Sequence, residues 1–248
     1  RQFRECEFRK DGFYLNGKKL KIRGLNRHQA YPYVGYAMPA SAQRADADLL
    51  KFELGCNLAR TSHYPDSTHF LDRCDEIGLL VFTEMPSWQF TGEGEWRENC
   101  LKNVADMVKR DRNHPCVILW GVRVNEGPDC DELYEKTNAI AHSLDDTRQT
   151  GGVRNFPQSH LLEDVYTYND FIHSGGKIAL NLPLLVAGPN APYLVTEHNG
   201  HMYPTKSFDR EEIRVEHALR HARVLNAAYG SSRTSGAIGW CMADYNTH

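Results

Sequence analysis

The chain has 248 residues, of which 41% are hydrophobic and 25% are charged, and its formal net charge is -3 at pH 7. This is the profile of a soluble globular protein with one sizeable core. The weak charge balance leaves no electrostatic footprint for nucleic acid, and no apolar run reaches the about 18 residues that indicate a membrane span.

Strand-like and helix-like segments alternate along the chain. An Asn16-Gly17 pair predicts a hairpin turn, and the strand that follows it ends at Asn26. Ser41 is placed to cap a helix that ends at Gly55. The next predicted segments are strand 56–65, helix 67–78, strand 79–86, helix 96–112, strand 117–126, helix 131–145 and strand 148–153.

The second half continues the alternation with fewer helices, because residues 154–162 and 171–191 are typical of loops or short helices. The remaining predicted segments are strands 161–170, 191–200 and 235–245, and helix 208–230. Eight strands with helices between most of them favour an α/β fold, a closed (β/α)8 barrel. We expect residues 1–18 to be the tail of a preceding β-domain with its lead-in hairpin, and residues 19–248 to be the barrel, truncated after its eighth strand.

Seven cysteines are scattered singly, and none forms the Cys-x-x-Cys pair that is typical of structural zinc. Their odd number and irregular spacing are typical of reduced thiols in a reducing compartment. They therefore favour a cytoplasmic location, which little else in the sequence constrains.

Two glutamates stand where the active site of such a barrel forms, at the C-terminal ends of the strands. Glu126 and Glu197 follow apolar runs on the fourth and seventh strands, and a buried carboxylate is costly unless it is paired. On opposite sides of the barrel mouth they could flank a glycosidic bond, as in retaining hydrolysis, where the carboxyls lie about 5–5.5 Å apart. Spacing alone does not distinguish this catalytic pair from the alternative that one of the two glutamates only forms a salt bridge at the rim.

Further polar and aromatic residues end the neighbouring strands. Arg60 could keep Glu197 ionised, and His28 and His63 beside it favour binding of sugar hydroxyls, although a lone histidine is more often structural. Trp240 is equally consistent with a core position and with a platform on which a sugar stacks.

Six segments match a known family in its order: DGFYLNGKKLKIRGLNRHQ, NLARTSHYPDS, FLDRCDEIGLLVFTEMP, RDRNHPCVILWGVRVNEG, YLVTEHNGHM and GAIGWCMADY. They cover nearly the whole chain, which resembles the catalytic TIM barrel of glycoside hydrolase family 2, the β-galactosidase and β-glucuronidase family. The block RDRNHP, ILWG and NE is highly specific to that family.

The resemblance implies roles for single residues. Glu126 would be the general acid/base, Asn125 beside it would bind the sugar 2-hydroxyl, and Glu197 would be the nucleophile. The remaining implied roles are sugar or transition-state contacts for His28 and His63, a place beneath the nucleophile for Arg60, a hydrogen bond to the nucleophile for Tyr168, sugar binding for His201, and an apolar wall for Trp240.

The sequence also departs from the family pattern. WGVRVNE has one residue more than some members between WG and NE, which we read as neutral, and His201 follows the nucleophile at a spacing one residue longer than in the best-known members. Glu84 is followed by MPSWQF rather than by the magnesium-binding Glu-x-His, so we expect no essential metal there and no cofactor. The β-sandwich domains that normally precede the barrel are missing, so this chain alone could be poorly active.

The sequence therefore predicts a retaining hydrolase of terminal β-linked sugars, a β-galactosidase first. We expect a carbohydrate as its substrate, β-sandwich domains of a longer chain as its partners, and neither nucleic acid nor a membrane. The sequence leaves open whether the protein forms an oligomer. The alternatives are a β-glucuronidase or another family 2 exo-glycosidase, or a catalytically silent carbohydrate-binding barrel fragment.

Overall fold

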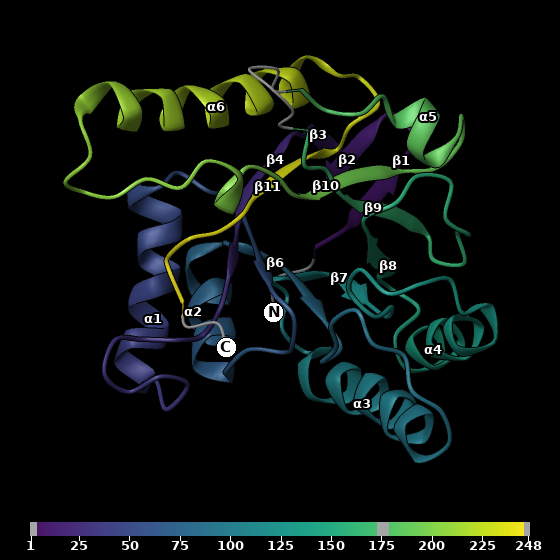
Figure 1. Cartoon of the computed structure of the whole chain (residues 1–248). Helices are drawn as coiled ribbons and strands as arrows, with labels where there is room; N and C mark the ends of the chain where they lie inside the picture. Colours follow the sequence, from purple (N-terminus) through teal and green to yellow (C-terminus); the bar gives the residue numbers. More distant parts are fainter. Residues whose placement is uncertain (1–3, 173–178, 246–248) are drawn as a thin grey trace.

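The structure is a computed structural model that describes residues 4–172 and 179–245. Eight parallel strands close into a barrel in the order β10-β11-β4-β5-β6-β7-β8-β9, with helices around it (Figure 1). The strands are β4 (Ile22–Arg27), β5 (Leu58–Thr61), β6 (Leu80–Glu84), β7 (Val117–Gly121), β8 (Gln149–Arg154), β9 (Val165–Asn169), β10 (Tyr193–Glu197) and β11 (Gly236–Gly239). The predicted TIM barrel is confirmed.

The helices lie outside the strands, and within the described ranges none of them is long and apolar enough to cross a membrane. They are α1 (Ala40–Asp48), the π-helical turn η1 (Leu49–Glu53), α2 (Thr68–Ile77), α3 (Glu95–Asp111), α4 (Asp131–Leu144), α5 (Pro183–Ala187), the 3-10 turn η2 (Gly200–Met202) and α6 (Glu211–Gly230). Most residues of the barrel strands are therefore buried, as the apolar runs in the sequence predict, with the exposed Arg23 of β4 as an exception.

A three-stranded antiparallel sheet packs against the N-terminal end of the barrel; its strands are β1 (Cys6–Arg9), β2 (Gly12–Leu15) and β3 (Lys18–Leu20). Asn16 and Gly17 have φ angles of 50° and 74°. A tight two-residue hairpin turn requires this left-handed conformation at both of its central residues. Phe8 and Phe13 are buried in the same cluster as Ile22 and the other inward-facing barrel residues. The hairpin sheet thus contributes to the barrel core.

Several element ends differ from the sequence prediction: β11, for example, ends at Gly239 rather than at residue 245. Helix α1 starts at Ala40 after Pro39, so Ser41 lies inside the first turn and does not cap the helix. Strand β7 ends at Gly121 rather than at residue 126. In the segment that follows, Val122 and Glu126 still donate to the carbonyls of Gly151 and Val153 on β8, so residues 122–126 bulge relative to β8. Arg123 in this bulge is buried and forms an ion pair with Asp129 at 2.7 Å. The short helix α5 agrees with the prediction for 171–191, of which residues 173–178 lie outside the described residues.

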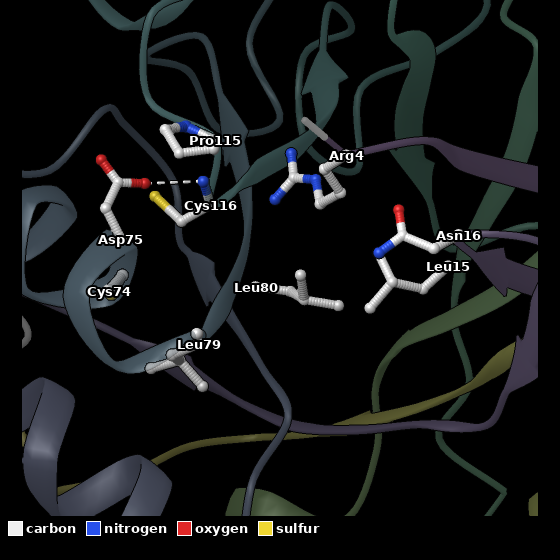
Figure 2. Close-up of a pocket in the computed structure, with 10 residues that line it drawn as sticks. Arg4, Leu15, Asn16, Cys74, Asp75, Leu79, Leu80, Pro115 and Cys116 are labelled. Atoms are coloured by element: carbon white, nitrogen blue, oxygen red, sulfur yellow. Dashed lines mark hydrogen bonds between the residues drawn. The ribbon is translucent and has the colours of Figure 1, made fainter. Parts of the chain in front are cut away.

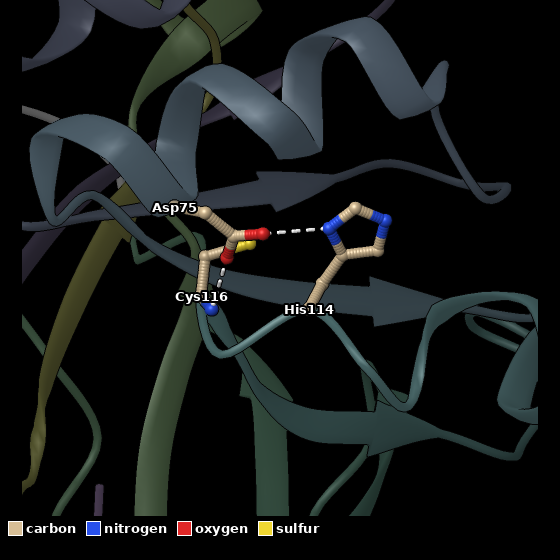
Figure 3. Close-up of side chains that lie close together, drawn as sticks. All are labelled: Asp75, His114 and Cys116. Carbon is tan, nitrogen blue, oxygen red and sulfur yellow. Dashed lines mark hydrogen bonds and ion pairs between the residues drawn. The ribbon is translucent and has the colours of Figure 1, made fainter. Parts of the chain in front are cut away.

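A cavity of about 310 Å³ lies at the N-terminal end of the barrel, where Leu80 begins β6 and Cys116 precedes β7 (Figure 2). Beside it, Asp75 on α2 faces the turn before β7 (Figure 3). One oxygen of Asp75 lies 2.7 Å from Nδ1 of His114, and the other accepts the backbone N–H of Cys116 at 2.7 Å.

These three side chains form a structural clamp rather than a metal site. Both carboxylate oxygens of Asp75 already accept hydrogen bonds, and the Cys116 thiol donates to the carbonyl of Leu71 at 3.5 Å. Burial raises the pKa of that thiol well above its ordinary value, which disfavours the thiolate that a metal would need. The clamp joins α2 to the start of β7.

The clamp should contribute its full stability between about pH 4 and pH 6.5. The lower limit is the unfolded pKa of the Asp75 carboxyl, and the upper limit is that of the His114 imidazole. Its hydrogen bond with Asp75 raises the pKa of His114, so that contribution is lost as pH rises through the folded pKa. Burial raises the pKa of Asp75, but hydrogen bonds from His114 and Cys116 outweigh it, so the net shift is downward and this contribution is lost only in acid.

Asp75→Asn should therefore reduce the free energy of unfolding by about 1–2 kcal/mol at pH 5.5 and by less at pH 8.5. Urea unfolding at the two pH values measures this. Asp106→Asn removes an exposed carboxylate that pairs with Lys102 on α3 and serves as the control. An equal loss at both pH values for Asp75→Asn would contradict the charged clamp.

Candidate active site

A pocket of about 590 Å³ opens at the C-terminal ends of the barrel strands. Six of the residues predicted from sequence line it: His28, His63, Glu126, Glu197, His201 and Trp240. The other lining residues are Tyr64, Pro86, Ser87, Trp88, Phe171 and Tyr245. The strand ends therefore gather the predicted side chains at one mouth, as parallel strands of a barrel must.

Glu197 ends β10, and its side chain is almost fully buried against Arg60 of β5. Nη1 of Arg60 donates to Oε1 of Glu197 at 2.7 Å. Burial raises the pKa of Glu197 above its ordinary value, and the positive charge of Arg60 opposes that rise. The guanidinium therefore favours the ionised form of a carboxylate that burial would otherwise neutralise.

Arg60 is the centre of a buried polar network beneath the pocket. Its side chain has no exposed surface, and it donates to both oxygens of Glu84, from Nη2 at 2.7 Å and from Nε at 3.1 Å. It also donates to Oδ1 of Asn26 at 2.7 Å and to Oδ1 of Asn125 at 2.8 Å. One guanidinium thus positions groups from four strands or strand ends, and it pairs with two buried carboxylates.

Two histidines and a tryptophan form one wall of the pocket. The His63 ring stacks on Trp240 with centroids 5.4 Å apart, and the His28 ring meets Trp240 edge-on at 5.5 Å. Nδ1 of His28 lies 3.0 Å from the Tyr64 hydroxyl. Burial, followed by the charges of His63 and Arg60, lowers the pKa of His28 to about 4, so His28 is neutral near pH 7 and can exchange hydrogen bonds with hydroxyl groups.

Glu126 lies five residues beyond the end of β7 and is less buried than Glu197. Its φ angle is 55°, a left-handed conformation that is uncommon for a residue with a side chain and that clusters at functional sites. Oε1 accepts from Nδ2 of Asn169 at 2.9 Å, and Oε2 accepts from Nε2 of Gln89 at 3.1 Å. Its strand is three positions from β10 around the barrel, so the carboxyls share one pocket without being directly opposite.

The structure corrects the placement of Tyr168. Its side chain packs outside the barrel in a cluster with Tyr193 and Val186, whereas the next residue, Asn169, points inward and contacts Glu126. Successive side chains of a strand point to opposite faces, so a shift of one residue reverses which of them reaches the pocket. Phe171, two residues further on, lines the pocket beside His201, with ring centroids 5.5 Å apart.

Glu84, Asn169 and Gln89 belong to the site but were not selected from sequence, although the positions of the first two carried a signal. Glu84 and Asn169 end apolar strands in the same way as the selected glutamates, and both contact selected residues. Gln89 lies in the loop after β6, where no periodicity indicates the direction of a side chain. Only the folded chain shows that this loop reaches Glu126.

Known proteins resemble this chain over nearly its whole length. The family model for glycosyl hydrolases family 2, TIM barrel domain, matches residues 6–211. A β-galactosidase of Thermoanaerobacterium thermosulfurigenes is 60% identical over 99% of this chain and 35% of that protein. A β-galactosidase of Thermoanaerobacter pseudethanolicus is 55% identical over 98% of this chain and 32% of that protein.

Among solved structures, a family 2 β-galacturonidase from Eisenbergiella tayi bound to galacturonate superimposes with a TM-score of 0.85 at 26% identity, over 98% of this chain and 48% of that one. The chain spans about a third of the length of the two β-galactosidases. Fold, motif order and sequence identity agree across these comparisons. The chain therefore belongs to glycosyl hydrolase family 2, as a TIM-barrel domain of that family.

Proposed function

We propose that this barrel hydrolyses terminal β-linked sugars with retention of configuration, with β-galactosides as the first substrates. The observation that carries the proposal is one pocket that holds two carboxyls in different surroundings. Glu197 is buried against Arg60, whereas Glu126 is less buried and is contacted by neutral amides. Retaining hydrolysis needs one ionised carboxylate and one carboxyl that exchanges a proton.

In the first step, an oxygen of Glu197 attacks the anomeric carbon and the glycosidic C–O bond breaks. The bonding electron pair moves to the leaving oxygen, which takes the proton of Glu126. In the second step, water gives a proton to Glu126 and attacks the anomeric carbon, whose bond to the Glu197 oxygen breaks, so that the Glu197 carboxylate and the sugar are released. Asn125 supports substrate binding, because its buried Nδ2 has no hydrogen-bond partner among the described residues and a sugar hydroxyl would satisfy it.

The composition of the pocket favours a neutral sugar. Its described lining includes two glutamates and neither lysine nor arginine, whereas a uronic acid needs a cation to offset its carboxylate. The two β-galactosidase relatives support the same choice. Because those relatives are about three times as long as this chain, we also propose that further domains, β-sandwiches among them, complete the protein and its subsites.

A panel of nitrophenyl glycosides tests the sugar class. We expect the β-galactoside to be cleaved fastest, with the β-glucuronide and β-galacturonide at least about tenfold slower in kcat/KM. Faster cleavage of a uronide would replace the galactosidase proposal by the glucuronidase alternative. Sugar binding without turnover of any glycoside would favour a non-catalytic carbohydrate-binding barrel.

Glu126→Ala tests the acid/base role. We expect kcat/KM to fall by about 10²–10⁴-fold for a β-galactoside with a poor leaving group, because that oxygen then departs without a proton. A dinitrophenyl β-galactoside should lose far less kcat/KM, and azide should restore its turnover and yield the β-galactosyl azide. An equal loss for both substrates, without azide rescue, would contradict the assignment.

A further inference from the structure

The loop after β6 is fastened by its backbone to the segment that carries Glu126. Trp88 and Asn125 form a parallel β-bridge, and the backbone N–H of Gln89 donates to the carbonyl of Asn125 at 2.8 Å. Gln89 has a φ of 56°, the left-handed conformation that residues with side chains rarely adopt. This loop is thus held in register with the residue immediately before Glu126.

The side chain of Gln89 reaches the carboxyl of Glu126 from that loop. Its Nε2 donates to Oε2 at 3.1 Å, while Nδ2 of Asn169, from β9, donates to Oε1 at 2.9 Å. Each oxygen of Glu126 therefore has its own amide donor, from a different part of the barrel rim. Two donors on the two oxygens restrict rotation of the carboxyl about its last bond.

Neutral donors suit a group that must both give and take a proton. Among residues 4–172 and 179–245 no ion pair involves Glu126, whereas Glu197 is paired with Arg60. A cation favours the ionised carboxylate strongly, but an amide N–H donates to a carboxylate oxygen and also to the carbonyl oxygen of the protonated acid. Amide donors can therefore orient Glu126 in both protonation states.

We propose that Gln89 is a positioning residue for the acid/base, which aims the Glu126 proton at the leaving oxygen. The proposal rests on the proposed function, in which Glu126 protonates that oxygen. It assigns to an exposed glutamine, on a loop outside the strands, a share in the proton transfer. Loss of the Gln89 amide leaves the carboxyl held by Asn169 alone and less restricted in rotation, so only reactions that need the proton should suffer.

The test measures kcat/KM of Gln89→Ala with two β-galactosides, because kcat/KM reports the step in which the leaving group departs. With methyl β-galactoside we expect a loss on the order of 10- to 100-fold. With 2,4-dinitrophenyl β-galactoside we expect the value to stay within about threefold, since a leaving group of low basicity needs little protonation. The matched control is Gln158→Ala, because Gln158 is also exposed and left-handed, with a φ of 60°, but it lies beside Val186, whereas Gln89 contacts Glu126.

Gln89→Asn separates the side-chain contact from backbone strain. Asparagine tolerates a left-handed φ and keeps an amide, but it is one methylene shorter and does not reach Oε2. It should reproduce the leaving-group dependence with an unchanged unfolding midpoint, and it keeps the test decisive if the alanine variant fails to fold. An equal loss with both substrates, or no loss with either, would overturn the positioning role while galactoside hydrolysis by the unaltered protein still stands. If the unaltered protein cleaves no β-glycoside, the proposed function fails and this role fails with it.

Discussion

Glu197→Gln is expected to lower kcat for the cleaved β-galactoside by on the order of 10⁴-fold or more. The amide keeps the size of the carboxylate, and its oxygen can still accept the hydrogen bond from Arg60. In the unaltered protein this bond spans 2.7 Å from Nη1 of Arg60 to Oε1 of Glu197. It cannot form the ester to the anomeric carbon, so the two-step route has no first step. Steady-state kinetics with the nitrophenyl substrate, and the unfolding midpoint of the variant, measure the effect.

A matched glutamate outside the pocket separates chemistry from the loss of a buried ion pair. Glu163 is paired with the buried Arg154 at 2.7 Å, so Glu163→Gln removes the same charge in a similar setting and should keep its turnover. A 2-deoxy-2-fluoro galactoside should in addition label the unaltered protein on the peptide that contains Glu197. Label on another carboxylate, or activity of Glu197→Gln within tenfold of the unaltered protein, would transfer the nucleophile to a different residue.

Arg60→Met should have the second large effect, on stability and on pH dependence together. It leaves Glu84 and Glu197 buried without their cation, so we expect the free energy of unfolding to fall by about 3–5 kcal/mol. Those Arg60→Met molecules that remain folded should also need a higher pH than the unaltered protein to reach full activity. Arg60 lowers the pKa of Glu197 against the upward effect of burial, so its removal raises that pKa and shifts the acid-side limb of the kcat/KM profile upward.

Arg154→Met provides the comparison, because Arg154 is also fully buried and paired with a buried glutamate. It should lose comparable stability without moving the pH profile. If Arg60→Met unfolds at all temperatures, Arg60→Lys keeps a positive charge and should show a smaller shift of the same limb. A stable Arg60→Met variant with an unmoved profile would contradict the role of Arg60 in keeping Glu197 ionised.

The sequence by itself determined the order of the elements and the end of the barrel that carries the chemistry. Apolar runs that are buried on both faces predict parallel strands, and the turn and cap residues between them place the helices to within a few residues. Polar residues that directly follow such runs meet at one rim because all strands of the barrel run in the same direction. The shared strand direction therefore predicts from sequence that Glu126, Glu197, His28 and His63 lie in one pocket, as they do.

Only the tertiary structure decided which of the neighbouring side chains at the strand ends and in the loops enter that pocket. The side-chain period of a strand is two, so the choice between Tyr168 and Asn169 depends on a register that the sequence does not mark. Between Gly121 and Glu126 the chain bulges from the ladder, and the buried Arg123 there pairs with Asp129, a contact that no local pattern indicates. The contact of Gln89 with Glu126 joins residues 37 positions apart through a loop whose direction is set by packing rather than by local pattern. Local pattern thus places strand ends, whereas long-range packing selects and orients the side chains that the chemistry needs.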